Sequence, residues 1–114
     1  MESKLLEIDG VRTDVVVNIA ASWFSRLVGL LNRNSLSDVE GLALVPCASI
    51  HTLWMRFTID AVFLDDSGKV LGVAEGIKPF RFCFAPKGTR VVLELASGNA
   101  KRTGINLEQV LKFV

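Results

Sequence analysis

The residues best suited to chemistry lie between Cys47 and Asp60, where the chain holds its densest run of polar side chains. His51 is the only histidine, so it is the only side chain whose unperturbed charge changes near neutral pH. Asp60 interrupts an apolar run, and a carboxylate there needs a donor or a cation. We expect His51 and Asp60 to meet an arginine in a small polar pocket. The alternative is a structural network, with His51 capping a loop and Asp60 paired to an arginine.

Three arginines are candidates for that pocket. Arg26 and Arg33 fall on one side of a predicted helix, because residues seven apart share a helical face. Two guanidinium groups at the rim of the sheet could hold a carboxylate or a phosphate in bidentate fashion. Arg56 belongs to the loop that leads to Asp60. The alternative is that Arg33 complements the helix C-terminus and that Arg26 pairs with a surface acid.

Metal binding and covalent catalysis are poorly supported. Cys47 and His51 could both reach a zinc ion, but paired ligand spacings and a second histidine are missing. A cysteine–histidine nucleophile cannot be inferred from two residues four apart in a loop. The sequence also lacks a glycine-rich phosphate loop, a nucleophile elbow and a dinucleotide-binding fingerprint. We therefore predict no metal and no cofactor.

The segment from Lys78 to Arg90 combines basic residues with Phe80, Phe82 and Phe84, and no acid lies between Glu75 and Glu94. Alternating phenylalanines on a strand can stack on single-stranded bases. The same spacing arises when one face of a strand packs into a core. We expect core packing of the three phenylalanines.

The elements that must position these residues are mostly short strands. The predicted strands are 4–8, 15–19, 42–45, 59–64, 69–74, 89–95 and 110–114. Asp9-Gly10 favours a tight turn between the first two. The 59–64 strand is predicted to be buried on both faces except at Asp60, and the 89–95 strand to be half exposed. Ser22 and the apolar residues that follow to Leu31 predict the one prominent helix, and 96–103 predicts a helical turn closed by Gly104.

This order predicts an α+β, mostly β fold, a small barrel-like sheet with one prominent helix. The 114 residues, half of them apolar, suit a single domain over 1–114 that needs no disulfide. With 13 basic and 12 acidic residues the net charge is +1, which makes nucleic acid an improbable partner. No apolar run is long enough to span a membrane, and the N-terminus does not read as a secretory signal. We therefore expect a cytoplasmic protein with reduced cysteines, monomeric by default and without a membrane partner.

Four motifs in this order resemble the DUF192 (UPF0127) family over residues 22–111. They are Arg26-x-x-Gly29-Leu30-x-x-Arg33, Cys47-x-x-Ile50-His51-Thr52-x-x-Met55-Arg56-Phe57, Ile59-Asp60-x-x-Phe63-Leu64-Asp65 and Leu93-Glu94-Leu95-x-x-Gly98. The resemblance implies a small β-rich domain with a prominent helix, found in bacteria and archaea, whose biochemical role is not established. It also adds weight to Arg26, Arg33, His51, Asp60 and Glu94, since these positions match the family's polar motif residues.

Together these observations favour a binding or accessory module. Its candidate ligand-binding residues are Arg26, Arg33, His51, Arg56, Asp60 and Glu94, and its partner would be an anionic or polar ligand or a protein. The alternative is a small-molecule hydrolase or lyase with His51 or Asp60 as base. A third reading is a single-stranded nucleic-acid binder that uses the Phe80–Arg90 segment.

Overall fold

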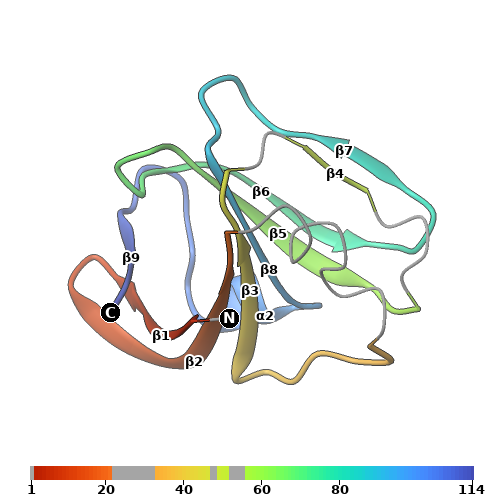
Figure 1. The fold of residues 1–114 in the computed structure, drawn as a ribbon, viewed down its shortest axis with the longest axis horizontal. Coiled ribbons are helices and arrows are strands. Elements are labelled where there is room, and N and C mark those ends of the chain that lie inside the picture. Colours follow the sequence, from red (N-terminus) through yellow and green to blue (C-terminus); the bar gives the residue numbers. More distant parts are fainter. Residues whose placement is uncertain (1, 22–32, 47–48, 52–55) are drawn as a thin grey trace.

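The computed structural model describes residues 2–21, 33–46, 49–51 and 56–114. These residues form nine strands and one short helix (Figure 1). In chain order the elements are β1 (Glu2–Ile8), β2 (Val11–Ala20), β3 (Glu40–Leu44), β4 (Ser49–His51), β5 (Ile59–Leu64), β6 (Val70–Ile77), β7 (Phe82–Phe84), β8 (Val91–Ala96), α2 (Asn99–Arg102) and β9 (Leu111–Phe113). The predicted mostly β, α+β class is confirmed. The predicted helix at 22–31 lies outside the described residues.

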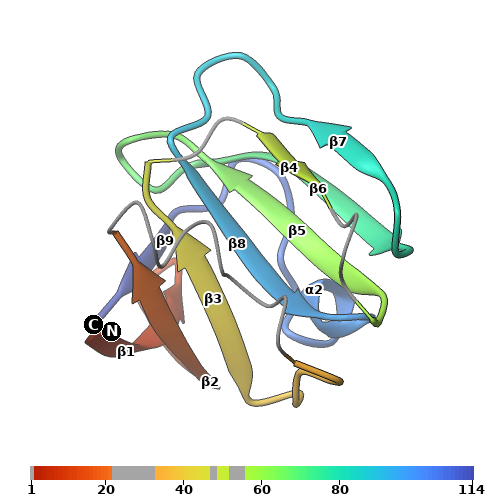
Figure 2. The ribbon, with the colours of Figure 1, turned by 45° about the vertical axis from the view of Figure 1, so that its right-hand side comes forward.

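Seven strands make one curled sheet in the order β6-β5-β8-β3-β2-β1-β9, and β4 pairs with β7 in a second, two-stranded sheet (Figure 2). Neighbouring strands in the large sheet are antiparallel except for the parallel pair β2–β3. The sheet does not close, but a bridge between Lys69 and Val110 links its two ends. The predicted barrel-like sheet is therefore an open, curled one.

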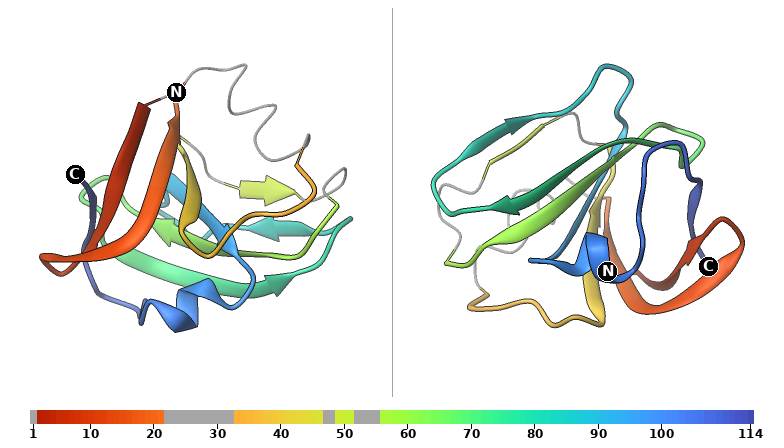
Figure 3. Two further views of the ribbon diagram at one scale, coloured as in Figure 1. Left: turned by 90° about the horizontal axis from the view of Figure 1, so that it is seen from below. Right: turned by 180° about the vertical axis from the view of Figure 1, so that it is seen from behind.

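Alternation along the strands divides the core into two apolar clusters, one on each face of the large sheet. The first, which we call the α2 face, includes Val62, Leu93 and Leu95 together with Ala100 of α2. The second, the β7 face, includes Ala61, Phe63, Val92 and Leu42, with Cys83 of β7 and Ala85 packed against it. Accordingly α2 and the β4–β7 pair lie on opposite sides of β5 and β8 (Figure 3).

The tight turn predicted between the first two strands is present. Asp9 and Gly10 both have positive φ, at 49° and 83°, as a two-residue hairpin turn with right-handed strand twist requires. The strands on either side are longer than predicted, because the pairing of β1 with β2 extends from Ile8↔Val11 to Glu2↔Ile19.

Two predictions about burial are wrong. The strand predicted as half exposed, β8, lies between β3 and β5 and is buried from Val92 to Ala96, because both of its faces are covered. The three phenylalanines predicted to pack in the core are instead exposed, Phe80 by 62%, Phe82 by 63% and Phe84 by 83%. The side of β7 that meets the core carries Cys83, so period-two alternation turns Phe82 and Phe84 outward.

Candidate functional site

Asp60 is fully buried and faces α2. Its Oδ1 accepts a hydrogen bond from the Gly76 N–H at 2.9 Å, and its Oδ2 accepts one from the Ala100 N–H at 3.0 Å. Within the described residues, the partners of this carboxyl group are two backbone amides, and neither Arg33 nor Arg56 is among them. Asp60 ties β5 to β6 and to the first turn of α2, which is a structural role.

Glu94 is the second buried acid, only 4% exposed in the middle of β8. Its register partners are Leu42 of β3 and Ala61 of β5, both members of the apolar cluster on the β7 face. Burial among these groups favours the neutral acid and raises the pKa of Glu94 from 4.5 to about 7. Glu94 is therefore a carboxyl group that changes charge near neutral pH.

The two acids lie on opposite faces of the same sheet. In the β5–β8 register Asp60 stands opposite Leu95, whereas Glu94 stands opposite Ala61, and adjacent register positions point to opposite sides. Asp60 therefore does not share a face with Arg33 and Arg56, so the expected pocket does not join it to these two arginines. The carboxyl on the arginine side is Glu94.

Arg33 reaches the β7 face through Glu40, the first residue of β3. Its Nη2 donates to both carboxylate oxygens of Glu40, at 3.0 and 3.1 Å. Burial opposes ionisation of Glu40, but hydrogen bonds from the Ser37 N–H and from Arg33 outweigh it and lower the pKa of the carboxyl. Glu40 shares the side of β3 that carries Leu42 and Leu44, so this ion pair lies at the end of the β7 face.

Arg56 lies at the same end of the molecule as Arg33. Its Nη1 donates to Oδ1 of Asn34 at 2.8 Å, and both side chains are exposed. The residues that anchor these segments, Leu36 and Phe57, pack into the cluster of the β7 face. None of the ion pairs within the described residues includes Arg56, so its charge faces solvent.

Two of the predicted site residues cannot be placed in the same detail. Arg26 lies outside the described residues. His51 is in β4, where its backbone pairs with Phe82 of β7, but its side chain is not among those described. Sequence reasoning did not find Glu40 or Asn34. Glu40 lies seven residues after Arg33 in the sequence. This spacing brings two side chains together on a helix, but it predicts no contact in a loop.

The described part of this site places two cations above an apolar surface that holds one ionisable carboxyl group. Arg33 and Arg56 supply cations at the rim, the cluster under them is apolar, and Glu94 supplies a carboxyl group that is neutral over much of the range below pH 7. No group of three or more His, Cys, Asp or Glu side chains within the described residues could hold a metal ion. Cys83 is a free thiol, and burial raises its pKa, which disfavours a reactive thiolate.

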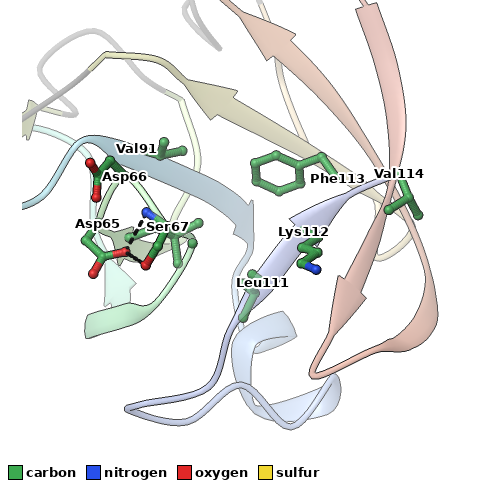
Figure 4. Close-up of a pocket in the computed structure, with 10 residues that line it drawn as sticks. Asp65, Asp66, Ser67, Val91, Leu111, Lys112, Phe113 and Val114 are labelled. Atoms are coloured by element: carbon green, nitrogen blue, oxygen red, sulfur yellow. Dashed lines mark hydrogen bonds between the residues drawn. The ribbon is translucent and has the colours of Figure 1, made fainter.

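A separate cavity of about 340 Å³ opens between β9 and the β5–β6 turn (Figure 4). Its apolar wall includes Val91, Leu111 and Phe113, and the Phe113 ring extends toward Val91. The Asp65 carboxylate at its rim accepts hydrogen bonds from Ser67 and from the Lys69 N–H, and these bonds, led by that from the Ser67 hydroxyl, lower its pKa. Asp65 thus holds the turn, and none of the predicted site residues lines this cavity.

The fold and the site define a small, mostly β domain with a cationic rim above one apolar face of its sheet. The chain belongs to the DUF192 family, described as "Uncharacterized ACR", whose model matches residues 4–113. This confirms the resemblance seen in the motifs. No helix within the described residues has the length and apolarity that a membrane span requires.

Two crystal structures share the fold. A protein of unknown function from Novosphingobium aromaticivorans is 23% identical with a TM-score of 0.84, and the alignment covers 96% of this chain and 84% of that one. A "putative transcription regulator" from Sinorhizobium meliloti is 20% identical with a TM-score of 0.87, and 98% and 94% are covered. At these identities the likeness extends to the fold alone. The sequence matches none of the curated proteins.

Proposed function

We propose that this domain binds a small anionic ligand, a carboxylate or a phosphate ester, at the rim of the β7 face. Arg56 would contact the anionic group, Arg33 would line the rim while held by Glu40, and Glu94 would lie beneath the ligand. The observation that supports this most directly is that Arg33, Arg56 and Glu94, three of the six predicted residues, share one face of the sheet. Arg26 and His51 stay candidates for the same site.

The charges on this face favour an anion over a cation. The charge of Arg33 is balanced by Glu40, whereas no acid of the described residues forms an ion pair with Arg56. A guanidinium group with free N–H donors matches a carboxylate or a phosphate in a planar, bidentate geometry. Glu94 in its neutral form could donate a hydrogen bond to a ligand oxygen, and in its charged form it would repel an anion.

An enzymatic role has less support. Asp60, one of the two bases considered, is fully buried on the opposite face and is held by two backbone amides, so it has no access to a substrate. That leaves His51 as the base of a hydrolase or lyase. Binding needs only the groups already described on the β7 face.

Thermal unfolding in the presence of inorganic phosphate or citrate tests the proposal. We expect either anion, at ten times its dissociation constant, to raise the melting temperature of the wild type by roughly 5 °C. Arg56→Gln should lose most of this shift because the exposed cation is gone. Arg12→Gln, which removes an exposed arginine at the start of β2, should retain it.

Equal shifts in all three proteins would indicate a general salt effect and would contradict a site at Arg56. The absence of any shift with phosphate, citrate or a panel of short mono- and dicarboxylates would contradict anion binding itself. Isothermal titration of the anion that gives the largest shift measures the affinity and stoichiometry directly.

A further inference from the structure

The most unusual surface of the molecule lies on β7 and the residue before it. Phe80, Phe82 and Phe84 together expose roughly 400 Å² of aromatic surface, since a phenylalanine offers about 200 Å². An apolar patch of a few hundred Å² on a small domain commonly marks an interaction site. The rings of Phe82 and Phe84 lie nearly parallel, 20° apart, with their centroids separated by 6.2 Å.

The fold holds these rings outward. Antiparallel pairing places Phe82 opposite His51 and Phe84 opposite Ser49, and the residue between them, Cys83, packs against the β7 face. A one-residue slip of β7 would bury the phenylalanines and expose Cys83, but it would break that pairing. Phe80 has a φ of 64°, a conformation that costs a bulky residue of order 1–3 kcal/mol. The structure thus maintains an exposed aromatic row.

The sequence around the row is cationic. Lys78, Arg81, Lys87 and Arg90 accompany it, and no acid occurs between Glu75 and Glu94. Of those two acids Glu94 is buried in the sheet. The whole chain carries a net charge of only +1, so this positive charge is a local property of the β7 segment. The partner that complements it is a polyanion.

We propose that the β7 segment binds single-stranded nucleic acid, with bases stacked on Phe82 and Phe84 and phosphates held by the neighbouring lysines and arginines. This surface is distinct from the anion site at Arg56. A single strand offers a flat ring and a negative charge in every nucleotide, which matches aromatic rings interleaved with cations.

An anionic membrane fits less well. The Arg81 guanidinium donates to the Phe80 carbonyl oxygen at 3.4 Å, so the charge lies beside the backbone that carries the rings. Insertion of the rings among acyl chains would carry that charge with them, at a cost that a nucleic acid does not impose. Contact with a phosphate-bearing strand instead leaves Arg81 at the polar surface.

The experiment measures fluorescence anisotropy of a labelled 12-nucleotide oligo(dT) at 50 mM salt. Phe82→Ala and Phe84→Ala should each weaken binding at least fivefold, because stacking on one aromatic ring contributes 1–3 kcal/mol. Leu107→Ala, which removes a 60% exposed apolar side chain elsewhere, is the control and should not change the affinity. With up to four phosphate contacts, affinity should fall by up to roughly 50-fold between 50 and 200 mM salt.

Binding that is absent at 50 mM salt, or equal in wild type, Phe82→Ala and Phe84→Ala, would overturn the proposal. Equal affinity for a 12-base-pair duplex would also overturn it, since paired bases cannot stack on the rings. If the protein does not bind oligo(dT) but sediments with phosphatidylglycerol vesicles, the surface binds membranes instead. Since Phe84 is 83% exposed, its variant keeps the fold even where that of Phe82 does not.

Discussion

Asp60 shows how backbone donors accommodate a buried carboxyl group. Both carboxylate oxygens accept backbone N–H groups, so removal of the side chain leaves the amides of Gly76 and Ala100 without their acceptors. We expect Asp60→Ala to lower the free energy of unfolding by about 3 kcal/mol, because the buried Ala100 N–H is left without an acceptor at a cost of 1–3 kcal/mol and the exposed Gly76 N–H loses its hydrogen bond as well.

Urea denaturation measures this cost, with Asp66→Ala as the control. Asp66 is exposed in the β5–β6 turn, and its removal should cost less than about 0.5 kcal/mol. If the two variants proved equally stable, the hydrogen bonds of Asp60 would contribute nothing and its structural role would be refuted.

Glu94 makes stability depend on pH in the opposite sense to an ordinary paired acid. Its pKa is about 7 when folded and about 4.5 when unfolded, so between these values the unfolded chain is ionised while the folded chain keeps its proton. The contribution of Glu94 is thus full below about pH 4.5 and is lost as pH rises to about 7. The loss amounts to about 3 kcal/mol.

Chemical denaturation of wild type and Glu94→Gln between pH 5 and 8 tests this. The wild type should lose stability over this range, and the variant, which cannot ionise, should lose much less. The acids with lowered pKa values, Asp14, Glu40 and Asp65, titrate below this range and do not interfere. Parallel pH profiles for the two proteins would show that Glu94 is not the group responsible.

Among the elements, the β5–β6 turn depends on a glycine. Gly68 has a φ of +88°, and a Cβ atom there would collide with the carbonyl oxygen of Leu111 in β9. Gly68→Ala should therefore cost more than about 2 kcal/mol, the sum of backbone strain and displacement of β9. Gly10 is a matched control, because its φ of +83° is similar and nothing lies within 4 Å of its Cβ position.

Gly10→Ala should cost only the backbone strain, about 1 kcal/mol. Thermal or urea unfolding of both variants separates the two effects. Equal costs at the two positions would show that β9 can move away from the turn without loss, so that the contact between Gly68 and Leu111 does not position it.

The elements could be predicted wherever local patterns determine them. The dipeptide Asp9-Gly10 predicts the first turn, and the run 59–64, which is apolar except for Asp60, predicts a buried strand. Burial of β8 could not be predicted. A charged residue such as Glu94 suggests that one side of the strand faces solvent, and only the tertiary structure shows that β3 and β5 flank β8. The prediction that the three phenylalanines pack in the core failed for the same reason. Alternation indicates that three residues share a side, but only the packing of Cys83 decides which side that is.

The same limit applies to the candidate site. Residue type and the family motifs suggested Arg33, Arg56 and Glu94 as candidates, but the sequence could not reveal that Asp60 lies on the other face of the sheet. That distinction depends on the register between β5 and β8, which arises from contacts more than thirty residues apart along the chain. Glu40, the partner of Arg33, was missed because its role depends on the same long-range assembly.

For the whole molecule we predict a single cooperative unfolding transition. The two apolar clusters share β5 and β8, so neither can be lost while the other persists. Far-UV circular dichroism and calorimetry should give coincident midpoints. Dithiothreitol should leave the midpoint unchanged, because Cys83 is a free thiol and the sequence contains only one other cysteine. Two separate transitions, or a midpoint lowered by reductant, would contradict this prediction.

The separation of Asp60 and Glu94 by one layer of sheet also bears on how sequences of this fold diverge. The hydrogen bonds by which Asp60 holds α2 lie on one face of the sheet. Substitutions near Arg33 and Arg56, on the other face, can therefore accumulate without breaking these bonds. Two crystal structures that keep this fold at 20–23% identity are compatible with a scaffold that tolerates such change. Different ligands could be accommodated on one face while the architecture beneath stays the same.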